Sequence, residues 1–498
     1  MDPPDITHDQ YSSWMALIYV FNLIVGTGAL TLPSVFAQAG WALGTVLIVG
    51  LAFISFVTVT YVIESMACAN AILHWKRLRL LKKDRIFQDS VYNSESSEEI
   101  SSDGTSEGDP LFQNACRYYE LDRKIELGEM ASLFFNKPGR VLFYICFCIY
   151  LYGDLSIYSA AVSKSIADIT CTFQPNETTN ATITPDSICW PDSKLTQYEA
   201  YRMYLIAFFL TLGPFVCFNV QKTKYLQLIT SIMRWLAFSI MIGLATHRLI
   251  TYGAAGHPKL ISVDGIPELF GACVYSFMCH HSLPALLTPI KDKQHLKTLI
   301  SLDYLLICSF YLLLALTGAF AFEHLKDLYT LNFSPTDDTN IYMRLVDYFL
   351  TMFPIFTLST SFPIIAITLK NNLIALFLDT NNLNQYNIIV REVLFPMLAV
   401  VPPILITFFT ENLNILVSFT GSYAGTVIQY LIPTFLVYNA RKTCTNILGL
   451  GIKNEYKSPF GHCFWIIFVI LWSFTCAILV TVNFVKKCTN PNGSGCFN

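Results

Sequence analysis

Long apolar runs separated by short polar segments dominate the pattern of this chain. Each run has about 18 residues or more, the length that a helix needs to cross about 30 Å of hydrocarbon. The pattern predicts about eleven membrane-spanning helices, at 13–38, 44–70, 140–167, 201–220, 225–248, 265–290, 298–321, 343–368, 390–410, 413–438 and 461–485. Only 13% of the 498 residues are charged and 53% are hydrophobic. Since soluble domains carry about 25% charged residues, we expect an all-α polytopic membrane protein.

The first run contains residues that interrupt a helix. Gly26-Thr27-Gly28 lies near its middle, Asn22 precedes it by one turn and Pro33 follows. Backbone groups inside lipid need hydrogen-bond partners, so such a break is tolerated only where it is buried in protein or lines a cavity. The feature therefore predicts a binding site at this position.

The sixth run is interrupted as well, by His280-His281 and Pro284. Interrupted spans at corresponding positions of two halves indicate the substrate site of a transporter with an inverted repeat. Spans one to five and six to ten would be the two repeats, over residues 13–250 and 265–440, with the span at 461–485 appended.

Lysine and arginine concentrate on one side of the predicted spans, which by the positive-inside rule is the cytosolic side. This places the tail 1–12 in the cytosol and the tail 486–498 outside. The acceptor sequons for N-glycosylation, at Asn176, Asn180 and Asn492, then all lie outside. The sequence does not distinguish the plasma membrane from an endolysosomal membrane. The tail 1–12 lacks the basic start of a cleavable signal peptide.

Two cysteines of the predicted outer loop 168–200 flank its glycosylation sequons. Cys171 and Cys189 lie in an oxidising compartment under this topology, which predicts a disulfide between them. Closing a loop of this length stabilises a fold by about 3 kcal/mol.

Residues 76–124 form the one long cytosolic insertion. The segment begins basic and then becomes rich in Ser, Glu and Asp, which predicts disorder and leaves room for a cytosolic partner. The net charge of −3 and the absence of a basic tract argue against nucleic acid as a partner.

The residues at both breaks resemble those of a known family. The run Asn22-x-x-x-Gly26-x-Gly28-x-Leu30-x-x-Pro33, followed by Gly40-Trp41, resembles the first span of the amino acid/auxin permeases. Phe277-Met278-Cys279-His280 with Pro284 is similar to the sixth span of the sodium-coupled neutral amino acid transporters. The resemblance implies a LeuT-type fold, with a five-plus-five inverted repeat and an eleventh helix.

The resemblance also implies where a substrate binds. The amides of Gly26, Thr27 and Gly28 would hold a carboxylate at the positive end of a half-helix. Phe277 and Cys279 would line the pocket from the sixth span. Alternatively, the glycines of the first span only permit close helix packing.

An ion site is expected at the other side of the first break. Carbonyls near Asn22 and Val25, together with the hydroxyls of Thr360 and Ser361 from the eighth span, would bind Na⁺ in this fold. The alternative is that these hydroxyls bond to their own helix.

Three further polar residues complicate sodium coupling. Asp154 and Arg234 are costly in lipid and are expected to face protein or water, and they could pair with each other. His280 could carry a proton or bond to a neighbouring helix. Some proton-coupled members of the superfamily place a fifth-span cation where others bind sodium. Arg234 in that role would exclude sodium, so Na⁺ and H⁺ both remain candidates.

The expected function is secondary active transport of small neutral amino acids or related zwitterions, by symport with Na⁺ or H⁺ and alternating access. The alternative is an amino acid sensor with little transport, which signals through the loop 76–124. An enzyme is not expected, because His280-His281 lacks the spacing of a metal-binding motif and no nucleophile motif is present. No cofactor is expected beyond the coupling ion, and the oligomeric state is not predicted.

Overall fold

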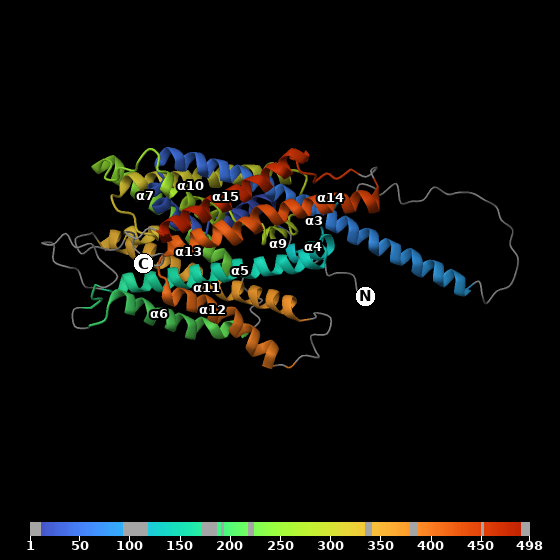
Figure 1. Ribbon diagram of the computed structural model, residues 1–498, viewed down its shortest axis with the longest axis horizontal. Coiled ribbons are helices and arrows are strands. Elements are labelled where there is room, and N and C mark those ends of the chain that lie inside the picture. The colour runs from blue at the N-terminus through green and yellow to red at the C-terminus, as the bar shows by residue number, and fades with distance from the viewer. Residues whose placement is uncertain are drawn as a thin grey trace.

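The computed structural model is a bundle of helices (Figure 1) and describes residues 11–92, 118–171, 187–190, 194–217, 224–333, 341–378, 387, 389–449 and 453–489. The three predicted glycosylation sites and both terminal tails lie almost wholly outside these residues. Within them, the only strand-like pairings are two isolated bridges, Tyr11 with Ile290 and Ile188 with Thr196.

The all-α polytopic class is confirmed, because eight helical segments are long and apolar enough to cross a membrane. They are α3 (Trp41–Tyr92), α5 (Lys137–Thr170), α7 (Lys224–Tyr252), α10 (Leu296–Ala321), α11 (Ile341–Phe377), η6 with α12 (Val390–Phe409), α13 to α14 (Leu413–Leu448) and α15 (Cys463–Thr489).

The first predicted span is broken, as expected. Helices α1 (Ser13–Ile24) and α2 (Thr27–Ala39) pass the length and hydropathy test together and are bent by 56° at the break. The sixth is also interrupted, between α8 (Ile266–Ser276) and α9 (Leu283–Leu287). The fourth consists of α6 (Gln197–Leu212) and the short 3₁₀ helix η2 (Gly213–Cys217). Neither of these last two contains a helix of 18 residues, so the count of eleven spans and the five-plus-five repeat stay predictions.

Helix α3 is longer than expected. It continues to Tyr92 and projects from the bundle (Figure 1), so disorder from residue 76 onward was the wrong expectation for 76–92. Extending an existing helix adds one hydrogen bond per residue fixed and avoids the cost of nucleation. The Leu, Lys and Arg residues of 76–83 are good helix formers. Residues 93–117 of the predicted loop lie outside the described part of the chain.

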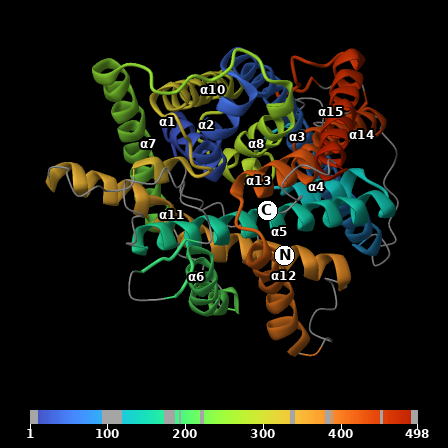
Figure 2. The ribbon, with the colours of Figure 1, turned by 60° about the vertical axis from the view of Figure 1, so that its left-hand side comes forward.

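The two broken spans form the centre of the bundle. In α2, every residue from Thr27 to Phe36 is buried, and in α8 every residue from Leu269 to Ser276. Helix α8 lies between α2 and α13 (Leu413–Thr420), as Figure 2 shows. On the α13 side, a Cβ added to Gly421 would lie 1.9 Å from the carbonyl oxygen of Gly271. Small residues therefore bring these backbones into direct contact.

The ends of α1 and α9 are joined by main-chain hydrogen bonds. The Tyr11 amide donates to Pro289 O at 3.2 Å, and the Lys291 amide donates to Tyr11 O at 3.1 Å. The start of one broken span is thereby linked to the end of the other.

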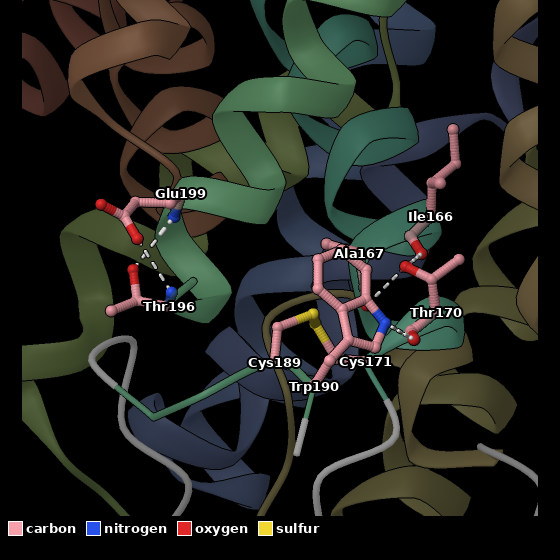
Figure 3. The surroundings of a disulfide bond; sticks show 8 residues. All are labelled: Ile166, Ala167, Thr170, Cys171, Cys189, Trp190, Thr196 and Glu199. Carbon is pink, nitrogen blue, oxygen red and sulfur yellow. Dashed lines mark hydrogen bonds between the residues drawn. A yellow bond between two sulfur atoms is a disulfide. The ribbon is translucent and has the colours of Figure 1, made fainter. Parts of the chain in front are cut away.

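A disulfide joins Cys171, at the end of α5, to Cys189 (Figure 3). Next to it, Trp190 Nε1 donates to the carbonyl of Thr170 at 2.8 Å. The disulfide and this hydrogen bond together fasten the segment before α6 to the end of α5.

Candidate functional site

The break in the first span leaves the N-terminal end of α2 uncapped. Gly26 is the N-cap residue and has no side chain to accept from the helix, and no described side chain caps it. The first N–H groups of a helix have no intrahelical partner. A Cβ added to Gly26 would meet no atom within 4 Å. Gly26 therefore borders open space at the start of α2, where the Ala29 amide donates to Gly26 O at 3.2 Å and the amides of Thr27 and Gly28 have no described partner.

Gly28 lies in a different environment. A Cβ at this position would lie 2.5 Å from Ser276 Oγ, 2.8 Å from Ser276 Cα and 2.9 Å from Tyr275 Cδ1. Gly28 thus permits the close crossing of α2 and α8. The two glycines therefore differ: Gly28 allows close packing, whereas Gly26 borders open space, and binding of a carboxylate there stays a prediction.

Two buried polar atoms flank the break. Asn22 Oδ1 has no hydrogen-bond partner in the described chain, and Thr27 Oγ1 lies near the Tyr158 side chain. Buried polar atoms are usually satisfied, so such an exception calls for an explanation. Both atoms can accept a hydrogen bond, and they flank the uncapped amides on the α1 and α2 sides of the break.

The carbonyls at the end of α1 are bonded to protein donors. Arg234 of α7 donates from Nη1 to Asn22 O. The Tyr311 hydroxyl of α10 lies 3.0 Å from Ile24 O and 2.9 Å from Ser276 O. This one hydroxyl therefore connects the C-terminal ends of α1 and α8. Next to Arg234, Trp235 stacks on Phe21 with ring centroids 3.9 Å apart and packs α7 against α1.

The two hydroxyls predicted to bind an ion bond within their own helix. Thr360 and Ser361 of α11 both donate to Thr357 O at 2.9 Å, as the alternative interpretation expects. Val25, whose carbonyl is the other predicted ligand, donates from its amide to Phe21 O at 2.8 Å. Among the described residues, no group of three or more His, Cys, Asp or Glu side chains could hold a metal ion.

Asp154 does not pair with Arg234. Its carboxylate accepts a hydrogen bond from the hydroxyl of Tyr275, in the last turn of α8. Within the described chain, no ion pair under 4.0 Å joins Asp154 to Arg234. The reason is geometric: α7 directs Arg234 toward the end of α1, and α5 directs Asp154 toward α8.

Residues after the end of α8 face α10 and α3. The Phe277 ring is fully buried and packs on Tyr311 with centroids 5.1 Å apart. Cys279 Sγ lies 3.3 Å from the Tyr304 hydroxyl. His280 Nε2 lies 2.9 Å from Thr58 Oγ1 of α3, which is the contact with a neighbouring helix that one interpretation expects.

Three tyrosines of this region were not predicted. Tyr275 and Tyr311 bond to Asp154 and to the helix ends, and Tyr158 interacts electrostatically with Asp154 and Arg234. Tyr158 lies one helical turn after Asp154, so the spacing i, i+4 was a signal for a shared face. Tyr311 carries no such signal, because its two partners are main-chain carbonyls from other helices.

Comparison with known proteins matches nearly the whole chain. The family model described as "Transmembrane amino acid transporter protein" matches residues 9–71 and 112–481. The chain is similar to the Transmembrane protein 104 homolog of Drosophila melanogaster, with 53% identity over 95% of this chain and 97% of the relative. It is also similar to Transmembrane protein 104 of Homo sapiens, with 48% identity over 96% and 97%. The homolog of Dictyostelium discoideum is 35% identical over 95% and 96%.

Proposed function

The chain belongs to the transmembrane amino acid transporter family, among the Transmembrane protein 104 relatives, and from this premise we propose that it is a secondary active transporter of small neutral amino acids or related zwitterions. Membership in a transporter family also favours transport over catalysis. The observation that carries the proposal is the uncapped N-terminus of α2 beside the open space at Gly26.

This position suits the two charges of a zwitterion. Unpaired amides at the positive end of α2 would bind the carboxylate. The ammonium group needs acceptors, and the unpartnered oxygen Asn22 Oδ1, together with Thr27 Oγ1, would supply them. The donors for the carboxylate and the acceptors for the ammonium group lie around the same break, so a small amino acid would reach both.

The donors that bond to the carbonyls at the end of α1 bear on the choice between Na⁺ and H⁺ as the coupling ion. Arg234 and Tyr311 donate to carbonyls that a sodium ion would need. Arginine keeps its charge near neutral pH, so it would repel a cation at this place. We therefore propose that transport does not depend on sodium bound at the end of α1, and that protons drive it.

The membrane arrangement of the proposal places the N-terminus in the cytosol and the C-terminus outside, with Asn176, Asn180 and Asn492 on the outer side. The protein would act in the plasma membrane or an endolysosomal membrane. Digestion of the native protein with an N-glycosidase tests this topology, since loss of mass requires that these asparagines face the outside or the lumen.

Uptake of radiolabelled alanine by purified full-length protein in proteoliposomes tests the function. We expect uptake that an inward pH gradient accelerates and that is unchanged when choline replaces sodium. In the Gly26→Ala variant, a methyl group would fill the open space and uptake would fall. Folded protein that transports no amino acid of a small neutral set would refute the proposal.

A second function, amino acid sensing, is favoured by one observation on α3. Ser55 and Thr58 of this helix bond to Phe277 O at 3.4 Å and to His280 at 2.9 Å, at the sixth-span break. The same helix projects from the bundle to Tyr92 (Figure 1) and would present 76–124 to a cytosolic partner. Stabilisation by alanine against heat, without uptake, would support sensing instead of transport.

A further inference from the structure

Asp303 of α10 is a buried acid without a partner. Asp303 is 1% exposed, and neither of its carboxyl oxygens has a hydrogen-bond partner in the described chain. Asp154, the other acid near the breaks, accepts from Tyr275. Asp303 therefore differs from Asp154 in having nothing that would stabilise a negative charge.

The surroundings place Asp303 beside the sixth-span break. It lies near Cys279, in the linker between α8 and α9. The adjacent Tyr304 has its hydroxyl 3.3 Å from Cys279 Sγ and 2.9 Å from Ser55 Oγ of α3. The hydroxyls of Tyr304 and Ser55 thus contact each other and not the carboxyl group.

No described contact joins a cationic group to Asp303. Helix α2 has no titratable side chain. On α1, α3 and α7, which also pack against α10, the titratable groups that contact other residues are Tyr19 with Tyr11, Tyr61 with Phe460 O, Glu64 with Arg441, His74 with Tyr118, Arg234 with Asn22 O, His247 with Thr251 and Arg248 with Phe322.

An ionised carboxylate in such a place is strongly unfavourable, because burying an unpaired charge costs far more than burying a neutral acid. A bound metal ion would be the other solution, yet hard cations need several oxygen ligands. Among the described residues, Asp303 belongs to no group of three or more His, Cys, Asp or Glu side chains that could hold such an ion. The acid is therefore neutral in this conformation.

We propose that Asp303 is the proton-carrying group of the transport cycle, which holds a proton while the sixth-span break is closed and releases it when the break opens. This rests on the proposed transport function. On opening, water reaches the acid, the O–H bond breaks, water takes the proton and the carboxylate keeps the electron pair. Because the ends of α1 and α9 are joined through Tyr11 and Lys291, movement of the first broken span would also move the sixth.

Infrared difference spectroscopy between wild type and Asp303→Asn tests directly whether the carboxyl group of Asp303 is protonated. Purified full-length protein in detergent at neutral pH should show the carbonyl band of a protonated carboxylic acid, and the variant should lack it. Asp347→Asn, which replaces an acid of α11 that is 8% exposed, serves as the matched control and should keep the band. Absence of the band from wild type would overturn the proposal. So would failure of Asp303→Asn to fold, because a neutral amide has the shape of a neutral acid.

Transport in proteoliposomes tests the coupling, with radiolabelled alanine as the probe. Asp303→Asn should keep the exchange of labelled for unlabelled alanine and lose the acceleration by a pH gradient, while Asp347→Asn keeps both. If wild type exchanges alanine but a pH gradient has no effect, the role of Asp303 is refuted and the transport function stands. If wild type shows no exchange, alanine transport itself is refuted, and the infrared result still decides whether Asp303 holds a proton.

Discussion

Replacing Gly28 by alanine adds a methyl group at the point where α2 crosses α8. The new carbon would lie 2.8 Å from Ser276 Cα and 2.9 Å from Tyr275 Cδ1, whereas ordinary contacts begin at 3.4 Å. The Ser276 contact is with the backbone, so rotation of a side chain cannot relieve it and the helices must separate. Overpacking of this kind costs about 1–3 kcal/mol, and alanine regains about 0.5–1 kcal/mol over glycine in a helix. We expect a net loss of about 1–2 kcal/mol.

Gly26→Ala is the matched control, because the same methyl group would meet no atom within 4 Å. Its free energy of unfolding should stay within about 0.5 kcal/mol of wild type, the usual range for a site without special contacts. Reversible unfolding in mixed micelles of a mild detergent and dodecyl sulfate measures both variants. Equal stability of Gly28→Ala and wild type, or an equal loss in both variants, would refute the assignment of Gly28 to packing and Gly26 to open space.

The same unfolding measurement tests three further predictions. Tyr311→Phe should cost about 1–3 kcal/mol, because it removes the one hydroxyl hydrogen that two buried carbonyls share, whereas Tyr430→Phe removes a hydroxyl that has no partner and should be nearly neutral. Glu64→Gln should cost about 3–5 kcal/mol, because it breaks a buried ion pair with two bonds of 2.8 and 2.7 Å. Cys171→Ser should cost about 3 kcal/mol by opening the disulfide, whereas Cys463→Ser, at an exposed free cysteine, should change little.

The breaks in the first and sixth spans could be predicted because their causes are local. Glycine and proline weaken a helix wherever they stand, and the structure ends α1 at Ile24 and α8 at Ser276. The presence of most spans was also predictable, since the hydropathy pattern follows the membrane thickness and eight described segments are long and apolar enough to cross it. The continuation of α3 to Tyr92 was missed, because polar composition suggested disorder while helix propensity favoured extension.

The partners at the site could not be predicted, since they depend on how distant helices meet. The sequence offers Asp154 and Arg234 as two buried charges, and pairing them is the simplest hypothesis. In the structure they bond instead to Tyr275 and to Asn22 O. Likewise, nothing local separates Gly26 from Gly28; only the position of α8 does. Asp303 was overlooked for the same reason, because an acid without partners is recognised only once its neighbours are known.

Recognition of a carboxylate by the amides of α2 is the central claim, and competition in an exchange assay tests it most directly. Proteoliposomes loaded with unlabelled alanine should accumulate labelled alanine. We expect external alanine to compete with this uptake, whereas ethylamine, which has the same ammonium group and lacks the carboxylate, should not. Competition by ethylamine as strong as that by alanine, or no accumulation by folded protein, would contradict it.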